Sequence, residues 1–471
     1  MGRTLALLLV LGVTAAYGAA VEPGQTWLLG SPATLYGENR TVTLRPGDQF
    51  EVLEVAPPWV AGRCRRGDAV AEGRLPLAAL ATALTAEQFE TLRAAMSTYV
   101  YADDEAARTK ARETIEGFAG AGFRLQELAA SRVGLHVEDP PSGPQRLRVK
   151  VGEGVEAEYY LVLPRGYDAS RTYPLIVSFH GMGGTGTYYQ HWTAGNVEAR
   201  EPFIVIAPTS ADPQHRQWWC DDSGELIAAG LRATIRDYAV DPWHVYAEGF
   251  SMGGVAATFW PQTWPDRFAA IGAQAACFWR NEHDVAGSVE NVRLVPAFLA
   301  VGENDAPGNV GAFKRLDEEL TRLKTPHVFK LLANTGHSFG GQEDDLLAFL
   351  LKYQRNLAPR AIAYNVSRFP GGRLMPEWVY WVRLREASHQ GRIEAQVQGN
   401  AIQIKTTRVQ RFDVYLNDWL VDLDKPVSVL VNRRSVHAGK VARDVFTMLD
   451  VIRETGDPAR LFSATIEVDV R

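Results

Sequence analysis

Short apolar runs and stretches of helical periodicity alternate along residues 147–357. Runs such as "PLIVSFHG" and "FIVIAP" are separated by segments such as "GELIAAGLRATIRDY", in which apolar residues recur every three or four positions. Several runs are apolar at nearly every position, which is typical of strands buried on both faces of a parallel sheet. The alternation predicts an α/β domain in which helices cover a sheet of parallel type.

The pattern changes at the C-terminal side of this segment. Over residues 358–471, stretches such as "RIEAQVQ" and "RFDVYLN" alternate apolar and polar residues with a period of two. This period predicts antiparallel strands with one face toward solvent. We therefore expect a C-terminal all-β domain similar to a β-sandwich.

Two smaller segments precede the α/β domain. "TVTLRPGDQFEVLEV" alternates around a Pro-Gly turn, which predicts a small β domain over residues 21–83 that resembles bacterial SH3-like modules. Residues 84–136 are predicted to be helical, and Thr85 with Gln88 forms a capping-box pattern at the start. A Pro-rich linker is expected over residues 137–146.

The first twenty residues predict export. One early Arg3 precedes a run of Leu, Val and Ala, and the small residues that follow suit cleavage after Ala20. Residues 1–20 are therefore expected to be a signal peptide, and the mature protein to be secreted or periplasmic. An uncleaved anchor is the alternative. No later run is apolar for long enough to span a bilayer.

Composition narrows the classes of partner and cofactor. The chain has 471 residues and a formal net charge of −6, and without clustered Lys and Arg it is not expected to bind nucleic acid. An odd number of cysteines leaves at least one outside an internal disulfide. Cys220 and Cys277 either form a disulfide or remain buried thiols, and Cys64 is the third. Neither Cys nor His spacing resembles a zinc site, so no metal and no organic cofactor is expected.

The stretch "VYAEGFSMGG" at residues 245–254 contains a G-x-S-x-G motif centred on Ser251. Chance alone gives about 0.2 such matches in a chain of this length and glycine content. Here, however, the motif ends a predicted strand and opens a predicted helix, which is the context of a nucleophilic serine. A side chain at Gly249 or Gly253 would collide with the adjoining strand or helix. The alternative interpretation is an ordinary Gly/Ser loop.

Two further residues complete a catalytic pattern. Asp305 follows the run "AFLAVG", and His337 follows the run "VFKLLA". In the order serine, aspartate, histidine, His337 would take the proton from Ser251 and Asp305 would orient the imidazole. Glu303 is the alternative carboxylate.

A glycine-rich loop, "FHGMGGTGT", follows an earlier strand at residues 179–187. Its backbone N–H groups could face the oxyanion of a tetrahedral intermediate, with the N–H of Met252 as a second donor. A flexible turn or a phosphate cradle is the alternative. No Gly-Lys-Ser/Thr follows, which excludes a nucleotide-binding P-loop.

These motifs together resemble the α/β-hydrolase superfamily. The closest resemblance is to carboxylesterases, polyhydroxybutyrate depolymerases and feruloyl esterases, in which H-G-x-G-G and G-x-S-x-G-G occur together. "VDPWHVYAEGFSMGG" is also similar to a stretch of prolyl-oligopeptidase-like peptidases, with His244 where Arg is common. The resemblance implies Ser251, Asp305 and His337 as catalytic residues, and backbone oxyanion donors at Gly181, Met182 and Met252.

Aromatic residues in loops after the predicted strands could line the substrate pocket. The candidates are Tyr188, Trp192, Trp218 and Trp219. Such side chains can bind an acyl or aryl group or stack on a sugar. Packing against the edge of the sheet is the alternative.

The sequence therefore predicts a secreted serine esterase that works through an acyl-enzyme. Its expected substrates are small acyl or aryl esters, including esters linked to polysaccharide. His337 follows Ser251 by only 86 residues, which leaves little space for a large lid. A serine peptidase of prolyl-oligopeptidase-like type is the first alternative. The second is a cell-surface binding protein with a degenerate hydrolase core, although the complete set of catalytic residues argues against it.

Overall fold

The computed structural model describes two compact units. The first holds the described residues up to Gly134 together with Asp444–Leu461, and the second holds Leu135–Arg443 and the residues from Phe462 onward. The described residues are 25–470, except for gaps at 30–32, 37–40, 45–47, 57–58, 67–68, 77–82, 138–139, 152–154, 194–201, 213, 215–216, 277–284, 340, 369–373 and 376. The predicted signal peptide and Cys277 therefore lie outside the described residues.

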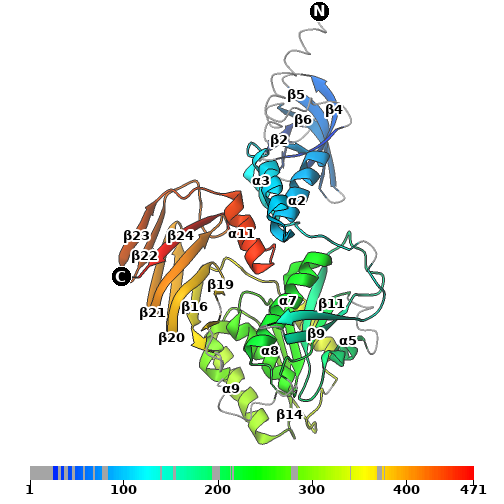
Figure 1. Ribbon diagram of the computed structural model, residues 1–471, viewed down its shortest axis with the longest axis vertical. Helices are drawn as coiled ribbons and strands as arrows, with labels where there is room; N and C mark the ends of the chain where they lie inside the picture. The colour runs from blue at the N-terminus through cyan, green and yellow to red at the C-terminus, as the bar shows by residue number, and fades with distance from the viewer. Residues whose placement is uncertain are drawn as a thin grey trace, which may run out of the picture. The chain divides into compact units, whose positions relative to one another are not determined.

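A mixed eight-stranded sheet forms the centre of the second unit (Figure 1). Its strands lie in the order β15-β14-β13-β12-β10-β11-β9-β8. All neighbours from β11 through β15 pair in parallel, whereas β8 and β9 add an antiparallel edge. The strands are β8 (Gln145–Val151), β9 (Val155–Val162), β10 (Tyr173–Phe179), β11 (Ile204–Pro208), β12 (Val240–Phe250), β13 (Ala270–Gln274), β14 (Ala297–Gly302) and β15 (His327–Leu332).

Helices cover both faces of this sheet, which confirms the predicted α/β class. Leu175 and Val177 of β10 pack in one apolar cluster with α7 (Asp221–Asp237), α8 (Met252–Thr263) and α9 (Pro307–Leu323). Ile176, between them, points to the opposite cluster with α5 (Gln190–Thr193) and α10 (Glu343–Leu350). Every residue of β11, β13 and β14 is buried. The continuously apolar runs are therefore strands covered on both faces.

The strands from residue 361 onward form a second sheet in the same unit. Its main path is β16 (Ala361–Asn365), β20 (Val382–Gln398), β21 (Ala401–Leu416), β22 (Val427–Val431) and β23 (Arg434–Gly439), with β19 (Trp378–Val379) on β20 and β24 (Ala464–Asp469) on β21. Along β24 buried and exposed residues alternate strictly, as the period of two predicts. The β21–β22 pair is parallel, unlike the antiparallel pairing expected for this segment. A short pair, β17 (Ser367–Arg368) and β18 (Leu374–Met375), lies apart from the main path.

Polar contacts join this sheet to the helical side of the α/β domain. Arg392 of β20 pairs with Glu290 of η4 (Val285–Val292), at 2.6 Å from Nη1 to Oε2 and 2.8 Å from Nη2 to Oε1. Next to this pair, Asn291 and Asn365 exchange hydrogen bonds of 3.0 and 2.8 Å. These hydrogen bonds and this ion pair attach the β-sheet domain to the α/β domain by specific contacts.

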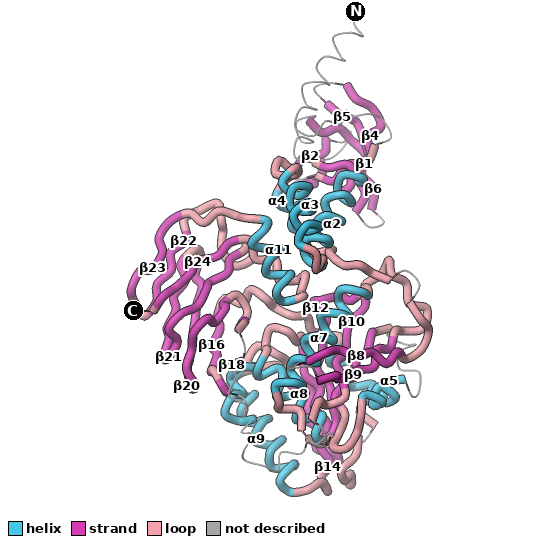
Figure 2. The backbone as a smooth tube through the Cα atoms, viewed as in Figure 1, coloured by secondary structure: helices cyan, strands magenta, loops and turns pink. Residues whose placement is uncertain are grey.

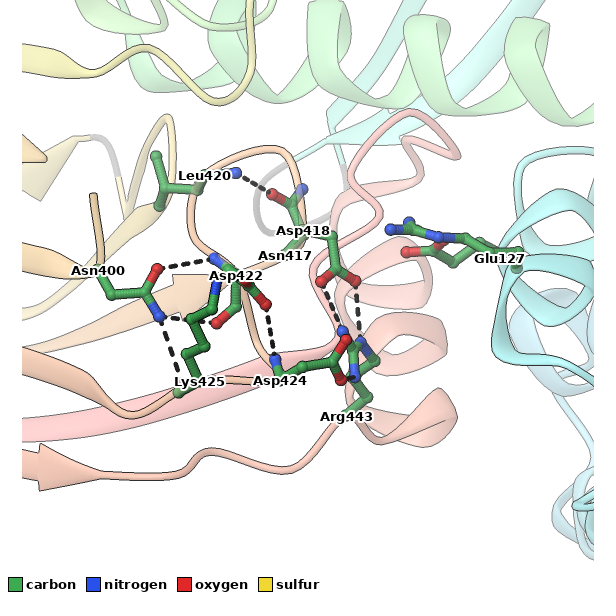
Figure 3. A network of polar contacts seen from close by, with 10 residues as sticks. Glu127, Asn400, Asn417, Asp418, Leu420, Asp422, Asp424, Lys425 and Arg443 are labelled. Carbon is green, nitrogen blue, oxygen red and sulfur yellow. Dashed lines mark hydrogen bonds and ion pairs between the residues drawn. The ribbon is translucent and has the colours of Figure 1, made fainter. Parts of the chain in front are cut away.

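The loop after β21 has its own polar network (Figure 3). Arg443 lies between two carboxylates, with Nη2 2.7 Å from Oδ1 of Asp418 and Nη1 2.7 Å from Oδ1 of Asp424. Asn400 donates to the carbonyl oxygen of Asp422 and accepts its N–H. These contacts fix the loop that connects β21 to β22.

The first unit combines a β-sheet with helices (Figure 2). The seven-stranded antiparallel sheet has the order β3-β2-β6-β5-β4-β1-β7. Its strands are β1 (Thr26–Leu28), β2 (Ala33–Tyr36), β3 (Thr41–Leu44), β4 (Gln49–Ala56), β5 (Trp59–Arg66), β6 (Ala69–Pro76) and β7 (Leu84–Thr85). The helices are α2 (Ala86–Tyr101), α3 (Glu105–Glu116) and α4 (Phe123–Ala130). The capping box predicted at Thr85 and Gln88 is confirmed, with both reciprocal hydrogen bonds formed.

A helix from the C-terminal segment also belongs to the first unit. The segment 358–471 was expected to be all-β, but it contains α11 (Val445–Thr455). Asp444 caps this helix by accepting the N–H groups of Phe446 and Thr447. Buried Met448, Leu449 and Ile452 join the apolar cluster of α2 and α4. These three residues are spaced as on one face of a helix, unlike the period of two in the neighbouring segments, which explains why the chain forms a helix here and not a strand.

Among the described residues, no helix has both the length and the apolar character needed to cross a bilayer.

Candidate active site

Ser251 occupies the sharp turn between β12 and α8. Its backbone has φ 59° and ψ −123°, a strained conformation for a residue with a side chain. A Cβ at Gly249 would lie 2.2 Å from the carbonyl oxygen of Gly253, and a Cβ at Gly253 would lie 1.9 Å from that of Phe179. The steric reason predicted for the two glycines is therefore confirmed.

The structure brings Ser251, His337 and Asp305 together. The Nε2 of His337 lies 2.9 Å from Oγ of Ser251, and its Nδ1 lies 2.9 Å from Oδ2 of Asp305. Glu303, the alternative carboxylate, is exposed and accepts the N–H of Asn334 instead. Asp305 is thus the carboxylate that faces the imidazole.

Asp305 is buried and held by two donors besides the histidine. The backbone N–H of Ala306 and the side-chain amide of Asn309 both donate to its Oδ1, over 2.6 and 3.0 Å. Asp305 also lies just before the N-terminus of α9, where the helix dipole favours negative charge. These contacts stabilise the carboxylate in the orientation that faces His337.

The glycine-rich loop lies directly beside Ser251. A Cβ at Gly181 would come within 3.4 Å of Cβ of Ser251. Met182 follows in the same loop and is 49% exposed. Met252 is the first residue of α8, so its N–H belongs to the helical turn that has no intrahelical acceptor. The arrangement can present backbone donors to an oxyanion near Ser251.

Buried side chains hold this loop in place. The Nε2 of His180 accepts the N–H of Ser210 over 3.0 Å, so Nδ1 carries the proton and donates to the carbonyl oxygen of Gly181 over 2.7 Å. The indole N–H of Trp218 donates to the carbonyl oxygen of His180. These hydrogen bonds therefore fix the position of the loop.

The four aromatic residues predicted as pocket candidates lie in different environments. Trp192 and Trp218 are 0% exposed, so their side chains have no surface to offer a substrate and the packing alternative applies to them. Trp219 is half-buried and packs against the core of the sheet. Tyr188 is half-buried, and its ring stacks on those of His191 and Phe339.

Four rings contact one another in a series that reaches His337 through Phe250. We call them the aromatic cluster, namely Tyr188, His191, Phe250 and Phe339. The centroid of Phe250 lies 5.0 Å from that of His337 and 4.1 Å from that of Phe339. Phe339 stacks on His191 at 4.3 Å, and burial lowers the pKa of His191, which favours the neutral ring. The sequence analysis did not predict His191, Phe250 or Phe339 at this place. The signal available in the sequence was that Phe250 directly precedes Ser251 and that Phe339 follows His337 by two positions.

Two other titratable groups in the α/β domain have pKa values raised by burial. Glu248, three residues before Ser251, is fully buried, and burial raises its pKa to about 7. Cys220 carries a free thiol whose pKa is raised by burial. Within the described part of the chain, no three His, Cys, Asp or Glu side chains are grouped so that they could hold a metal ion.

Comparison with known proteins gives matches to part of the α/β domain, which includes Ser251 but ends before Asp305 and His337. The family model named Esterase matches residues 154–297. A probable feruloyl esterase C of Aspergillus terreus and feruloyl esterase C of Emericella nidulans are each 32% identical over 106 residues. Each alignment covers 21% of this chain and 38% of the relative, so the chain spans well under half the length of these relatives.

Solved structures of esterases also match part of this chain. A thermostable esterase is 22% identical, with a TM-score of 0.39, over 45% of this chain and 63% of that chain. A ferulic acid esterase from Anaeromyces mucronatus is 19% identical, with a TM-score of 0.38, over 46% and 91%. The family model and the curated relatives support assignment of this segment to an α/β-hydrolase esterase family that resembles the feruloyl esterases.

Proposed function

We propose that this chain, with its segment of the α/β-hydrolase esterase family, is an exported serine hydrolase that cleaves carboxylic esters. The observation that carries the proposal is the hydrogen-bonded series Ser251, His337 and Asp305, with its two links of 2.9 Å, on a strained strand-to-helix turn. A nucleophile, a base within hydrogen-bonding distance and a group that orients the base are the parts that acyl transfer needs.

In the proposed mechanism Oγ of Ser251 attacks the ester carbonyl while Nε2 of His337 accepts its proton. Backbone N–H groups of Met252 and of the loop at Gly181 and Met182 stabilise the oxyanion. His337 then gives the proton to the leaving alcohol, and the acyl group stays on Ser251. Water, deprotonated by His337, attacks the acyl-enzyme and releases the carboxylic acid.

Esters are favoured over peptides as substrates because of the family match. The matched model is an esterase model, and the curated relatives are named feruloyl esterases. We infer that the substrates are small acyl or aryl esters, including hydroxycinnamoyl esters carried by polysaccharide. Export is inferred from the predicted signal peptide at residues 1–20.

Initial rates on three substrates test the proposal. The mature chain would be assayed with 4-nitrophenyl acetate, methyl ferulate and a peptide 4-nitroanilide, beside Ser251→Ala and the exposed control Ser388→Ala. Ester turnover that falls by about 10⁴-fold in Ser251→Ala and is kept in Ser388→Ala supports the esterase. Comparable anilide cleavage would favour the peptidase, and no turnover that depends on Ser251 would favour the binding protein.

A further inference from the structure

Glu248 is a buried carboxyl group that the proposed mechanism does not use. It lies in β12, three residues before Ser251, and its side chain is 0% exposed. Its strand neighbours are Ser178 of β10 and Gly272 of β13, so the residue sits inside the sheet. A carboxyl group in such a place costs free energy unless polar groups surround it. An apolar residue would suit the strand better.

Three donors converge on the two oxygens of this carboxyl group. The Ser178 hydroxyl and the Trp192 indole N–H donate to Oε2 over 2.9 and 3.0 Å, and the Tyr188 hydroxyl donates to Oε1 over 3.4 Å. Burial is the largest cause of the raised pKa of Glu248, and the three hydrogen bonds oppose it. The carboxyl group is therefore the acceptor at the centre of a buried network.

Two of the donors come from the segment that follows the glycine-rich loop. Tyr188 lies in η3 (Gly186–Tyr189) and Trp192 in α5. The indole N–H of Trp192 can only donate, and it lies 3.0 Å from Oε2 of Glu248 and 3.2 Å from Oγ of Ser178. Loss of the carboxyl group would remove the shorter of these two hydrogen bonds from a buried donor. Glu248 thus fixes η3 and α5 against the strand that carries the nucleophile.

The same segment supplies two members of the aromatic cluster. Tyr188 stacks on His191 with centroids 5.5 Å apart, and His191 stacks on Phe339. Phe339 contacts Phe250, which lies beside the ring of His337. A shift of η3 and α5 would therefore move a half-buried aromatic surface next to the catalytic base.

We propose that Glu248 is a positioning residue that sets which esters the site accepts, because it holds the aromatic cluster in place through Tyr188 and Trp192. This inference rests on the proposed ester hydrolysis. Glu248 positions the rings rather than the triad. Its loss should therefore impair an ester large enough to contact the rings, and leave the chemistry on a small ester nearly unchanged.

The test compares kcat and KM for 4-nitrophenyl acetate and methyl ferulate. For Glu248→Leu, we expect KM for methyl ferulate to rise about tenfold and kcat for the acetate to change less than about threefold. Glu248→Gln keeps an oxygen that can accept from Trp192 and Ser178, so it should restore both constants to within about threefold of the wild type.

Tyr188→Phe removes only the hydroxyl that reaches Glu248. It should raise KM for methyl ferulate. In the double variant with Glu248→Leu, KM for methyl ferulate should be no higher than in Glu248→Leu alone, because both changes break the same contact between Tyr188 and Glu248. Tyr189→Phe is the matched control, since the Tyr189 ring packs on Tyr160 instead. Its KM should equal that of the wild type.

The outcomes separate this inference from the proposed function. An unchanged KM for methyl ferulate in both Glu248→Leu and Tyr188→Phe overturns the inference and leaves the esterase intact. An equal loss of kcat on both esters also overturns it, because Glu248 would then support the triad. A wild-type protein inactive on both esters, with Ser251 inert toward a fluorophosphonate, overturns both proposals. Should Glu248→Leu fail to fold by circular dichroism, Tyr188→Phe decides alone by the same criterion.

Discussion

Asn309 donates a side-chain hydrogen bond to Asp305, with 3.0 Å between Nδ2 of the amide and Oδ1 of the carboxylate. Both residues are buried. The Oδ1 and Oδ2 atoms of Asp305 lie 3.1 and 2.9 Å from Nδ1 of His337. The amide therefore restrains rotation of the carboxylate that orients the imidazole.

This relationship predicts a selective loss of turnover. Asn309→Ala should lower kcat for 4-nitrophenyl acetate about tenfold with KM unchanged, because the amide acts on the triad and not on the substrate. Asn309→Asp should lower it further, since a second carboxylate beside Asp305 opposes its charge. Asn304→Ala, a substitution at the exposed position before Asp305, is the control and should leave kcat unchanged. A rise in KM without loss of kcat in Asn309→Ala would show that the amide does not act through Asp305.

The two motif glycines should not tolerate a methyl group. Gly253→Ala would place Cβ 1.9 Å from the carbonyl oxygen of Phe179, so the turn must shift and Ser251 must move with it. We expect esterase activity to fall at least about 100-fold and the melting temperature to drop. In Gly311→Ala, where Cβ would meet only the end of the Arg315 side chain at 3.5 Å, stability should stay level or rise slightly. Full activity of Gly253→Ala would contradict the account of the turn.

The buried Glu248 should make stability depend on pH. Its folded pKa of about 7 lies above the ordinary glutamate value of 4.5, so between these pH values the folded state holds a proton that the unfolded state releases. The protonated carboxyl group therefore contributes to the free energy of unfolding in full below about pH 4.5. This contribution, on the order of 3 kcal/mol, is lost as the pH rises to about 7.

Glu248→Gln should remove this contribution to the pH dependence. Denaturant unfolding of the variant should give a flatter profile than the wild type over that interval, with exposed Glu386→Gln as control. Parallel profiles for Glu248→Gln and the wild type would show that the carboxyl titrates normally in the folded protein.

The Glu290–Arg392 pair predicts the opposite sign. The pKa of Glu290 is lowered to about 2 from its ordinary value of 4.5, and hydrogen bonds from Arg392 are the largest cause. Its stabilisation is therefore present above about pH 4.5 and is lost as pH falls toward about 2. Arg392→Met should lower the melting temperature by about 2–4 °C at neutral pH.

The effect of Arg392→Met should shrink in acid, because the wild-type pair is then lost as well. Lys405→Met, at an exposed position of β21, is the matched control and should leave the melting temperature unchanged. If Arg392→Met lowered the melting temperature by the same amount from neutral pH to about pH 2.5, the Arg392 side chain would stabilise this contact by packing rather than by its charge.

The α/β class and the proximity of Ser251, Asp305 and His337 could be predicted because their signals are local. Ser251, Asp305 and His337 each follow an apolar run, and parallel strands bring such positions to one edge of the sheet. The glycines around Ser251 are required by distances within one turn. Each of these inferences needs only a few neighbouring residues.

The surroundings of the site could not be predicted in the same way. Whether Trp192 lines the site or enters the core depends on its contact with Glu248, 56 residues away in the chain. The stack of His191 on Phe339 likewise joins loops that only the fold brings together. Helix α11 was missed because its short helical pattern lies among strands and its apolar face packs on α2 and α4, far away in sequence.

The most direct test of the central claim is the detection of an acyl-enzyme on Ser251. The mature chain would be mixed with excess 4-nitrophenyl acetate, quenched in acid within the first turnover, digested and analysed by mass spectrometry. The account predicts a burst of about one equivalent of 4-nitrophenol per active chain and an acetyl group on the peptide that contains Ser251. Turnover of the ester that persists in Ser251→Ala, or an acetyl group found only on another residue, would contradict it.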